Sequence, residues 1–333
     1  MPMPTSDTAV SRPDLGLLVD EYMEEESSMM GFIGTQVMPI VPVVEQSASF
    51  SVLPKEVMLN AYDTNRAMRG KYPRSDFEWE QGFYATVENG WEEAVDDREA
   101  KLYASRFDSE ALAARRATTV IQRAQEKRIA DIVFSSTNFT ANTITHEWDD
   151  ATNAVPMTDV ATGKSSIRDA CGMLPNTLII AYSTYQNLKV CAQIRDLIKY
   201  TFPGLDINRM SLSQLAQVLD VPQVLVGGAV YNSAKKGQDA SMSDLWSNEY
   251  AMLTRISNSP NISEACIGRT FLWTEESGNS HVVESYRDEE VRGDVIRVRH
   301  DTHEALIVSR DSSLAIKSNL STACSYLFDN VTT

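Results

Sequence analysis

Residues 109–134 read SEALAARRATTVIQRAQEKRIADIVF, and they hold the clearest structural signal in the chain. Apolar side chains recur there about every 3.6 residues, which is the period of an amphipathic α-helix. Asp108 or Ser109, followed by Glu110, supplies the N-terminal signal of that helix. At 1.5 Å per residue the helix would be about 39 Å long. We expect residues 86–135 to be helical, with this stretch as the longest part.

The other faces of this helix are basic, carrying Arg115, Arg116, Arg123, Lys127 and Arg128. The chain as a whole is acidic: 30 Lys and Arg stand against 46 Asp and Glu, a net charge of −16. So negative a chain is not expected to read duplex DNA by sequence, nor to bind an anionic membrane. Without other context, the basic residues form a solvated helix face.

Two segments precede the helix. In residues 1–44 we expect an arm, with a short helix capped by Ser11 and then an apolar stretch, GFIGTQVMPIVPVVE, broken by Gly and Pro. Polar and apolar residues alternate over 49–53, and a second extended run surrounds Phe77 to Tyr84. Two strands around a long polar tip predict an extended hairpin. Neither segment contains a core of its own, so each must pack on something else.

The rest of the chain divides into two parts. From Trp148 to Ile256 strand and helix signals alternate, with a capping box at Ser211 and Gln214, which predicts a compact α/β or α+β domain. Beyond Ala265 the chain is strand-rich. We expect strands over 178–180, 221–226, 249–256, 269–273, 281–286, 291–308 and 314–316.

No cluster of residues predicts catalysis. Gly163-Lys164-Ser165 lacks the first glycine of a phosphate-binding loop and is expected to be a loop entering a helix; Gly227-Gly228 lacks dinucleotide spacing and predicts a turn. His300 and His303 would point to opposite faces of a strand, as surface or subunit-contact histidines rather than metal ligands. The four cysteines form no CxxC pair, which favours buried thiols. We therefore predict no enzyme, catalytic residue, cofactor or metal.

The order of these elements, with local motifs, resembles a known family. The motifs are WEEAVDDRE at 91–99, WDD at 148–150, GMLPNTLII at 172–180 and LAQVLDVPQVLVGGAVY at 215–231. Together they resemble the major capsid proteins of tailed bacteriophages, with the Hong Kong 97-type fold, over residues 45 to 318. The resemblance implies an α+β fold with an N-terminal arm, an extended β-hairpin loop, a long spine helix, a peripheral domain and an axial domain.

The resemblance also implies a domain division. It assigns 1–44 to the arm, 45–85 to the extended loop, 86–148 to the peripheral domain with its spine helix, and 149–260 to the axial domain. Residues 261–333 would return to the peripheral domain, with the last strand in the axial domain. Lys55 lies in the loop, but nothing local identifies it with the crosslinking lysine of some members.

The function implied is that of a major capsid protein, a structural protein that self-assembles into the icosahedral head shell around double-stranded DNA. An encapsulin-like compartment shell and a cytosolic α/β enzyme are the alternatives. The expected partners are other copies in pentamers and hexamers, a portal protein, and possible separate scaffolding and decoration proteins, with DNA enclosed but not read. The expected location is the virion, after assembly in the host cytoplasm. The candidate intersubunit contacts are Phe32, Ile33, Phe50, Phe77, Trp79, Arg115, Arg116 and Arg123.

Overall fold

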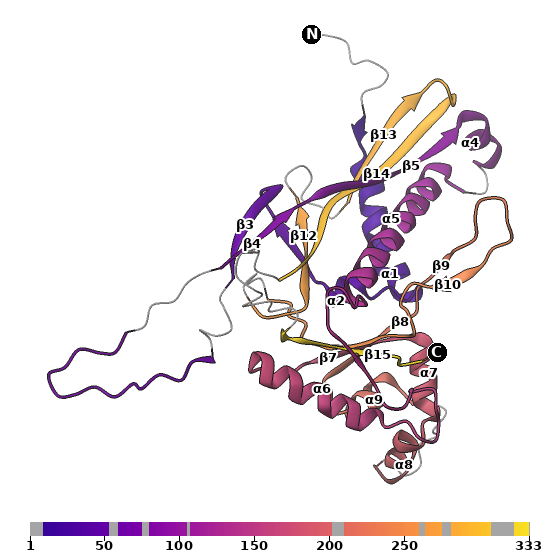
Figure 1. The fold of residues 1–333 in the computed structure, drawn as a ribbon. Coiled ribbons are helices and arrows are strands. Elements are labelled where there is room, and N and C mark those ends of the chain that lie inside the picture. Colours follow the sequence, from indigo (N-terminus) through magenta and orange to yellow (C-terminus); the bar gives the residue numbers. More distant parts are fainter. Residues whose placement is uncertain are drawn as a thin grey trace.

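The computed structural model describes residues 9–52, 59–74, 80–104, 107–201, 210–259, 264–274, 281–307 and 323–332. Two lobes follow one another along the molecule, one a twisted sheet backed by long helices and the other a smaller sheet covered by helices α6 to α9 (Figure 1). A long loop leaves the molecule sideways from strands β3 and β4. This is the predicted α+β architecture.

The sheet of the first lobe is built around its longest strand, β14. That strand spans Gly293–Leu306 and pairs antiparallel with three others. The strand order is β1 (Val10–Ser11), β13 (Val282–Asp288), β14, β12 (Gly268–Trp273) and β2 (Ile40–Val43), with β5 (Val87–Asp96) also on β14. The predicted strands over 269–273, 281–286 and 291–308 are confirmed as β12, β13 and β14.

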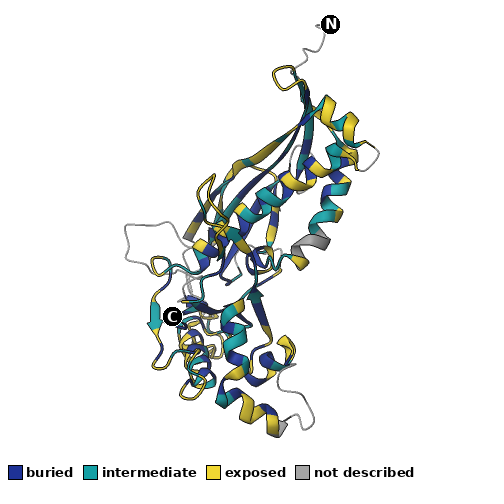
Figure 2. Ribbon diagram, turned by 90° about the vertical axis from the view of Figure 1, so that its right-hand side faces the viewer, coloured by how far each residue is buried: buried dark blue, intermediate teal, exposed yellow. Residues whose placement is uncertain are grey.

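The predicted long helix is confirmed as α5, Ser109–Val133. Asp108 caps it, since its carboxylate accepts a hydrogen bond from the Glu110 N–H at 3.0 Å. Helix α1, Pro13–Met29, packs on α5 and is longer than the short arm helix expected. One face of each helix meets the sheet in a single apolar cluster of Leu15, Val19, Val95, Ala113, Ala114, Ala117, Ile121, Val283, Ile296 and Val298. Figure 2 shows this buried layer between sheet and helices.

The prediction of helix across residues 86–135 is wrong at its start. Residues Val87–Asp96 form strand β5, and only α4, Asp97–Tyr103, and α5 are helical there. The cause is tertiary: β5 pairs with β14 from Val87 to Asp96, so the ladder overrides the helical preference of its glutamates.

The second lobe is organised on a five-stranded sheet. Its order is β6 (Ala141–Thr143), β15 (Ser325–Asp329), β11 (Ala251–Thr254), β7 (Thr177–Ala181) and β8 (Gln223–Gly227). The helices are α6 (Pro156–Cys171), α7 (Tyr182–Val190), α8 (Ala192–Thr201) and α9 (Leu212–Val218), and a hairpin of β9 (Val230–Asn232) and β10 (Met242–Asp244) projects from this lobe. The predicted strands over 178–180, 221–226 and 249–256 and the Ser211–Gln214 capping box are confirmed.

Two further predictions are wrong, and a third falls outside the described residues. That third one is the strand expected over 314–316, which stays a prediction; β15, which was not predicted, occupies an inner position of the second-lobe sheet. Gly163-Lys164-Ser165 lies inside α6, so its interpretation as a loop is wrong. His300 is only 2% exposed, and its ring centroid lies 5.0 Å from that of His281, so the expectation of a surface or contact histidine is also wrong. The reason is register, because His300 shares the core-facing side of β14 with Ile296 and Val298.

Candidate assembly surfaces

The arm is fastened to both lobes of its own chain. Helix α2, Gly34–Val37, begins where the backbone N–H groups of Ile33 and Gly34 donate to the Glu126 carboxylate of α5 at 2.8 and 2.7 Å. The indole Nε1 of Trp246, just before β11, donates to the same carboxylate at 2.7 Å. Burial raises the pKa of Glu126, while these three donors act to lower it. One carboxylate thus joins arm, long helix and second lobe.

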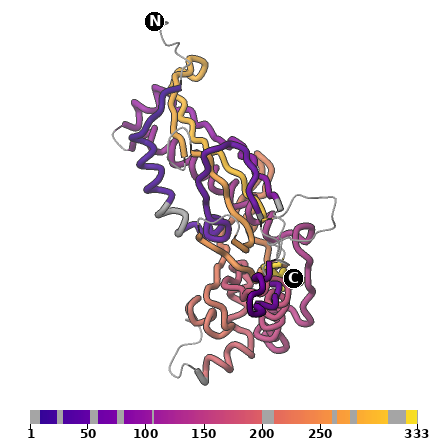
Figure 3. Tube along the Cα trace, turned by 90° about the vertical axis from the view of Figure 1, so that its left-hand side faces the viewer, coloured from indigo at the N-terminus to yellow at the C-terminus, as the bar shows by residue number. Residues whose placement is uncertain are grey.

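A close backbone contact supports this attachment. Gly31 has φ +71, and the Gly228 N–H donates to its carbonyl oxygen at 3.2 Å. A β-carbon on Gly31 would lie 3.0 Å from the Gly228 Cα, so only glycine permits this approach. Figure 3 shows the arm following the first lobe before it reaches the second.

These contacts decide where two predicted intersubunit residues lie. Ile33 is 6% exposed within the core of its own chain, and Phe32 packs against the same cluster. The apolar stretch over residues 31–44 is therefore covered largely by its own subunit. Val37, Met38, Val41 and Val43 are buried there as well. Little of the Ile33 side chain is left for a neighbour.

The basic residues of α5 differ in their surroundings. The Arg115 guanidinium lies 5.2 Å from the centroid of the Tyr22 ring on α1. Arg116 is 67% exposed and forms a 3.6 Å ion pair with Glu93. The Nε of Arg123 is buried and has no hydrogen-bond partner among the described residues. Arg115 and Arg116 are both exposed and Arg123 is half-buried, and the intersubunit role of all three stays a prediction.

The base of the predicted hairpin is formed by β3, Ser47–Val52, and β4, Glu80–Ala85, in antiparallel register. It is anchored on the first lobe. The Tyr84 and Phe271 rings stack with centroids 4.5 Å apart, and the Phe50 ring centroid lies 5.6 Å from that of Phe271. Phe50 therefore packs at least partly within its own chain. Phe83, on the other side of β4, is 42% exposed.

Beyond its base the hairpin extends into solvent. Met68 is 95% exposed and Tyr72 is 69% exposed. The Arg66 guanidinium lies 4.6 Å from the centroid of the Tyr72 ring, and Arg66 also donates to the Gly70 carbonyl oxygen at 2.7 Å. Phe77 and Trp79, the two aromatic contacts predicted nearby, lie outside the described residues.

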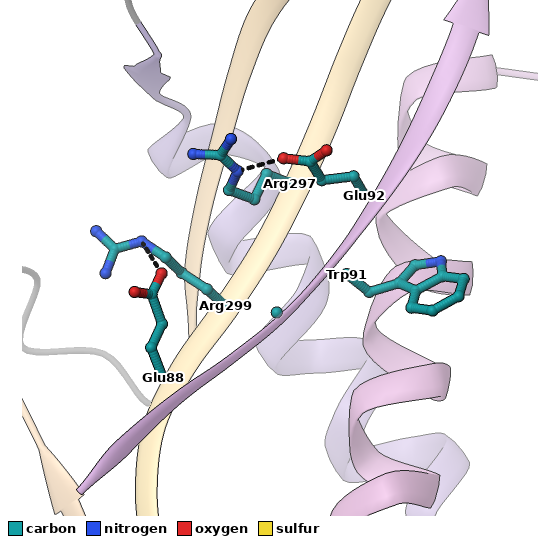
Figure 4. A pocket seen from close by; sticks show the side chains of 6 residues that line it. Glu88, Trp91, Glu92, Arg297 and Arg299 are labelled. Atoms are coloured by element: carbon teal, nitrogen blue, oxygen red, sulfur yellow. Dashed lines mark hydrogen bonds and ion pairs between the residues drawn. The ribbon is translucent and has the colours of Figure 1, made fainter.

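The face of the first-lobe sheet that lies opposite α5 carries charged residues of unequal exposure: the Glu88 side chain is 62% exposed, whereas those of Glu284 and Asp301 are 17% and 8% exposed. Figure 4 shows Glu88, Glu92, Arg297 and Arg299 on one side of β5 and β14, while Trp91 points to the other side, toward α5. A shallow hollow of about 430 Å³ lies along these residues. Sequence reasoning missed this surface because it depends on the strand β5, which was expected to be helix.

Among the described residues, no three His, Cys, Asp or Glu side chains are placed to hold a metal ion. Lys164 belongs to the sequence that resembles a phosphate-binding loop. Its Nζ donates hydrogen bonds to the Leu219 carbonyl oxygen at 3.0 Å and to the Asp220 carboxylate at 2.9 Å. All four cysteines are buried, and none of them forms a disulfide bond. Over the part of the chain that is described, no helix is long and apolar enough to cross a bilayer.

Known proteins resemble this chain in sequence and fold, although no family model matches it. The major capsid protein of Burkholderia phage BcepMu is 29% identical over 222 residues, covering 65% of this chain and 68% of the relative. A phage-related protein from Bordetella bronchiseptica RB50 superposes with a TM-score of 0.69 at 20% identity, covering 97% of this chain and 98% of that one. A putative prophage capsid protein from Escherichia coli CFT073 superposes with a TM-score of 0.51 at 10% identity, covering 97% and 99%.

The chain has the Hong Kong 97-type capsid fold. The resemblance to tailed-phage major capsid proteins, stated from the motifs, is thereby confirmed. We will call residues 59–74 the loop tip, and the side of β5, β13 and β14 that faces away from α5 the charged sheet face.

Proposed function

We propose that this chain is the major capsid protein of a tailed phage, which assembles with copies of itself into the icosahedral shell of the head. The observation that carries the proposal is the loop tip. It leaves the fold with Met68 and Tyr72 exposed and is held by hydrogen bonds among its own residues. Such a segment is costly to order unless a neighbour covers it.

The likeness in sequence favours a phage head over a compartment shell. The relative that matches over 222 residues is named a phage major capsid protein. The proposed role is structural and not enzymatic. It needs no cofactor, and the stability of the shell would come from many contacts that close together.

The two lobes would serve different parts of the shell. In this proposal the first lobe, with the spine helix and the β-rich return, is the peripheral domain. The second lobe, mainly residues 149–260, is the axial domain that gathers around fivefold and sixfold centres. The loop of 45–85 reaches over a neighbour, and the arm of 1–44 helps to hold the lobes together.

The partners follow from that role. Copies of the chain would form pentamers and hexamers, and one vertex would hold a portal protein; a separate scaffolding protein and a decoration protein are further candidate partners. The shell would assemble in the host cytoplasm and remain in the virion. Its net charge of −16 suits a wall that encloses DNA without gripping it, since DNA phosphates are repelled. Tight binding of isolated subunits to duplex DNA at physiological salt would contradict this.

Electron microscopy of the purified full chain tests the proposal. Closed shells or rings of five and six subunits are expected. A discrete monomer without any tendency to associate would overturn it. Trp79→Ala is expected to impair assembly more than subunit folding; equal loss of both would count against an intersubunit role for Trp79.

A further inference from the structure

Three cysteines from distant parts of the chain meet in the core of the second lobe. Cys171 is the last residue of α6, Cys266 comes shortly before β12, and Cys324 directly precedes β15. All three are buried in the same apolar cluster. The Cys324 thiol interacts with the thiols of both Cys171 and Cys266. The fold therefore gathers thiols that nothing in the sequence spacing connects.

Cys171 and Cys324 are in direct contact. The Cys324 thiol hydrogen-bonds the Cys171 sulfur, and the Cys171 thiol donates in turn to the Met173 carbonyl oxygen at 3.7 Å. The elements that carry them also pack together, since a β-carbon on Gly163 of α6 would lie 3.1 Å from the Phe328 ring of β15. Figure 1 shows α6 along the sheet that contains β15. The two sulfur atoms are thus neighbours that a bond could join.

The other two thiols are directed elsewhere. Cys266 donates to the Gly268 carbonyl oxygen at 3.6 Å, and its thiol also interacts with the Arg269 guanidinium. Cys191 donates to the Ala154 carbonyl oxygen at 3.6 Å. Sulfur-to-sulfur contact therefore favours the pair of positions 171 and 324 over any other pair.

The surroundings of this pair keep it reduced but not sealed. Cys171 is 4% exposed and Cys324 is 0% exposed. The hydrogen bond to Cys171, together with burial, raises the pKa of Cys324. A protonated thiol reacts slowly, so the pair survives in a reducing compartment. Cys171 is the easier of the two to reach, because Gly172 is exposed and Leu174 is 62% exposed.

We propose that Cys171 and Cys324 form a disulfide bond within one subunit when a peroxide oxidises them outside a reducing environment. The bond would tie the end of α6 to β15, an inner strand of the second-lobe sheet. It closes a long loop, from position 171 to 324, and would thereby stabilise the folded subunit. The inference goes beyond the proposed function and needs no assembly; in the proposed shell, the change of environment is release from the host.

The reaction consumes one hydrogen peroxide for each pair. The Cys171 thiolate attacks one peroxide oxygen, the O–O bond breaks, and the departing hydroxide takes up the proton that the thiol lost and becomes water. Cys171 is then a sulfenic acid. The Cys324 sulfur attacks the Cys171 sulfur, the S–O bond breaks, and a second water leaves with the Cys324 proton. The two sulfurs together lose two electrons, which reduce the peroxide to two waters.

Peptide mapping of the purified full chain tests this pairing. The folded chain is treated with hydrogen peroxide at mildly alkaline pH, then unfolded and alkylated. Two of the four thiols should be lost. A peptide with Cys171 should be joined to one with Cys324, lighter by two hydrogen atoms than the separate peptides, and dithiothreitol should release it. The same treatment of the chain unfolded in guanidinium should give mixed pairings, because only the fold selects this pair.

Variants and melting temperatures extend the test. Cys324→Ala should abolish the linked peptide, whereas Cys191→Ala, the matched control at another buried cysteine, should leave it unchanged. The oxidised unmodified chain should melt roughly 5 °C above its reduced form, and Cys324→Ala should show no such rise. The linked peptide is read on the unmodified chain, so an unstable variant does not decide the result.

Two outcomes would overturn the inference. One is the survival of all four thiols after prolonged peroxide treatment of the folded chain, and the other is a bond from Cys324 to Cys266 in place of Cys171. Neither outcome depends on the formation of shells. Electron microscopy of the same untreated protein therefore tests the proposed function separately.

Discussion

Replacing Glu126 with glutamine is the sharpest test of how the arm is held. The Oε1 atom accepts hydrogen bonds from the Ile33 N–H and the Trp246 indole, and Oε2 accepts one from the Gly34 N–H. In Glu126→Gln one of these oxygens becomes an NH₂ group. Whichever way the amide turns, at least one buried N–H then faces a donor instead of an acceptor.

The expected loss of stability follows from the one buried N–H that loses its acceptor. A buried donor left without an acceptor costs about 1–3 kcal/mol. Glutamine also relieves the cost of burying a charge, the burial effect that raises the pKa of Glu126. We therefore expect the arm to loosen by about 2 kcal/mol, which is roughly a 30-fold increase in its local opening.

Hydrogen–deuterium exchange of the full chain at neutral pH measures this opening directly. Peptides that cover residues 31–38 should exchange about 30-fold faster in Glu126→Gln, while peptides from α6 should be unchanged. Asp131→Asn is the matched control, since Asp131 is an exposed carboxylate on the same helix with a 3.6 Å pair to Lys127. Its effect should stay within about 0.5 kcal/mol. Unchanged exchange of the arm in Glu126→Gln would refute the reasoning.

Three further predictions concern the first lobe. Burial lowers the pKa of His281 to about 4 and that of His300 further. These folded-state values lie below the unfolded value near 6.5, so their contribution to stability is intact above pH 6.5 and is lost as the pH falls toward 4. Thermal melting curves recorded at falling pH should show this loss of stability, and in His281→Phe the melting temperature should depend less steeply on pH. In Arg128→Ala the buried Glu304 carboxylate loses the guanidinium nitrogens Nη2 and Nε, which donate to its oxygens at 2.9 and 3.1 Å. The free energy of unfolding in urea should therefore fall by about 2–3 kcal/mol. An unchanged free energy of unfolding would contradict this prediction. Gly82→Ala should destabilise the hairpin by about 1–3 kcal/mol, because its β-carbon would clash with a ring on the facing strand; unchanged limited proteolysis of the loop would count against this.

The long helix and most strands could be predicted because their signals are local. The helical period of residues 109–134, the cap at Asp108 and the apolar runs of the second lobe each act within a few residues. Their order along the chain was enough to indicate the Hong Kong 97-type fold. The hairpin base was predictable for the same reason, because both of its strands alternate.

The surfaces were harder to predict because they depend on distant pairing. Strand β5 is a strand only because β14 lies beside it, and the charged sheet face exists only through that ladder. Ile33 looked like an uncovered apolar residue, yet Glu126 and Trp246, both far along the chain, help to hold and cover it. No local sequence pattern predicts that one carboxylate accepts hydrogen bonds from separate segments of the chain.

Cryo-electron microscopy of the assembled full chain tests the central claim most directly. We predict closed shells in which the density of each loop tip lies over the neighbouring subunit. Particles that remain single subunits at high protein concentration would contradict the account.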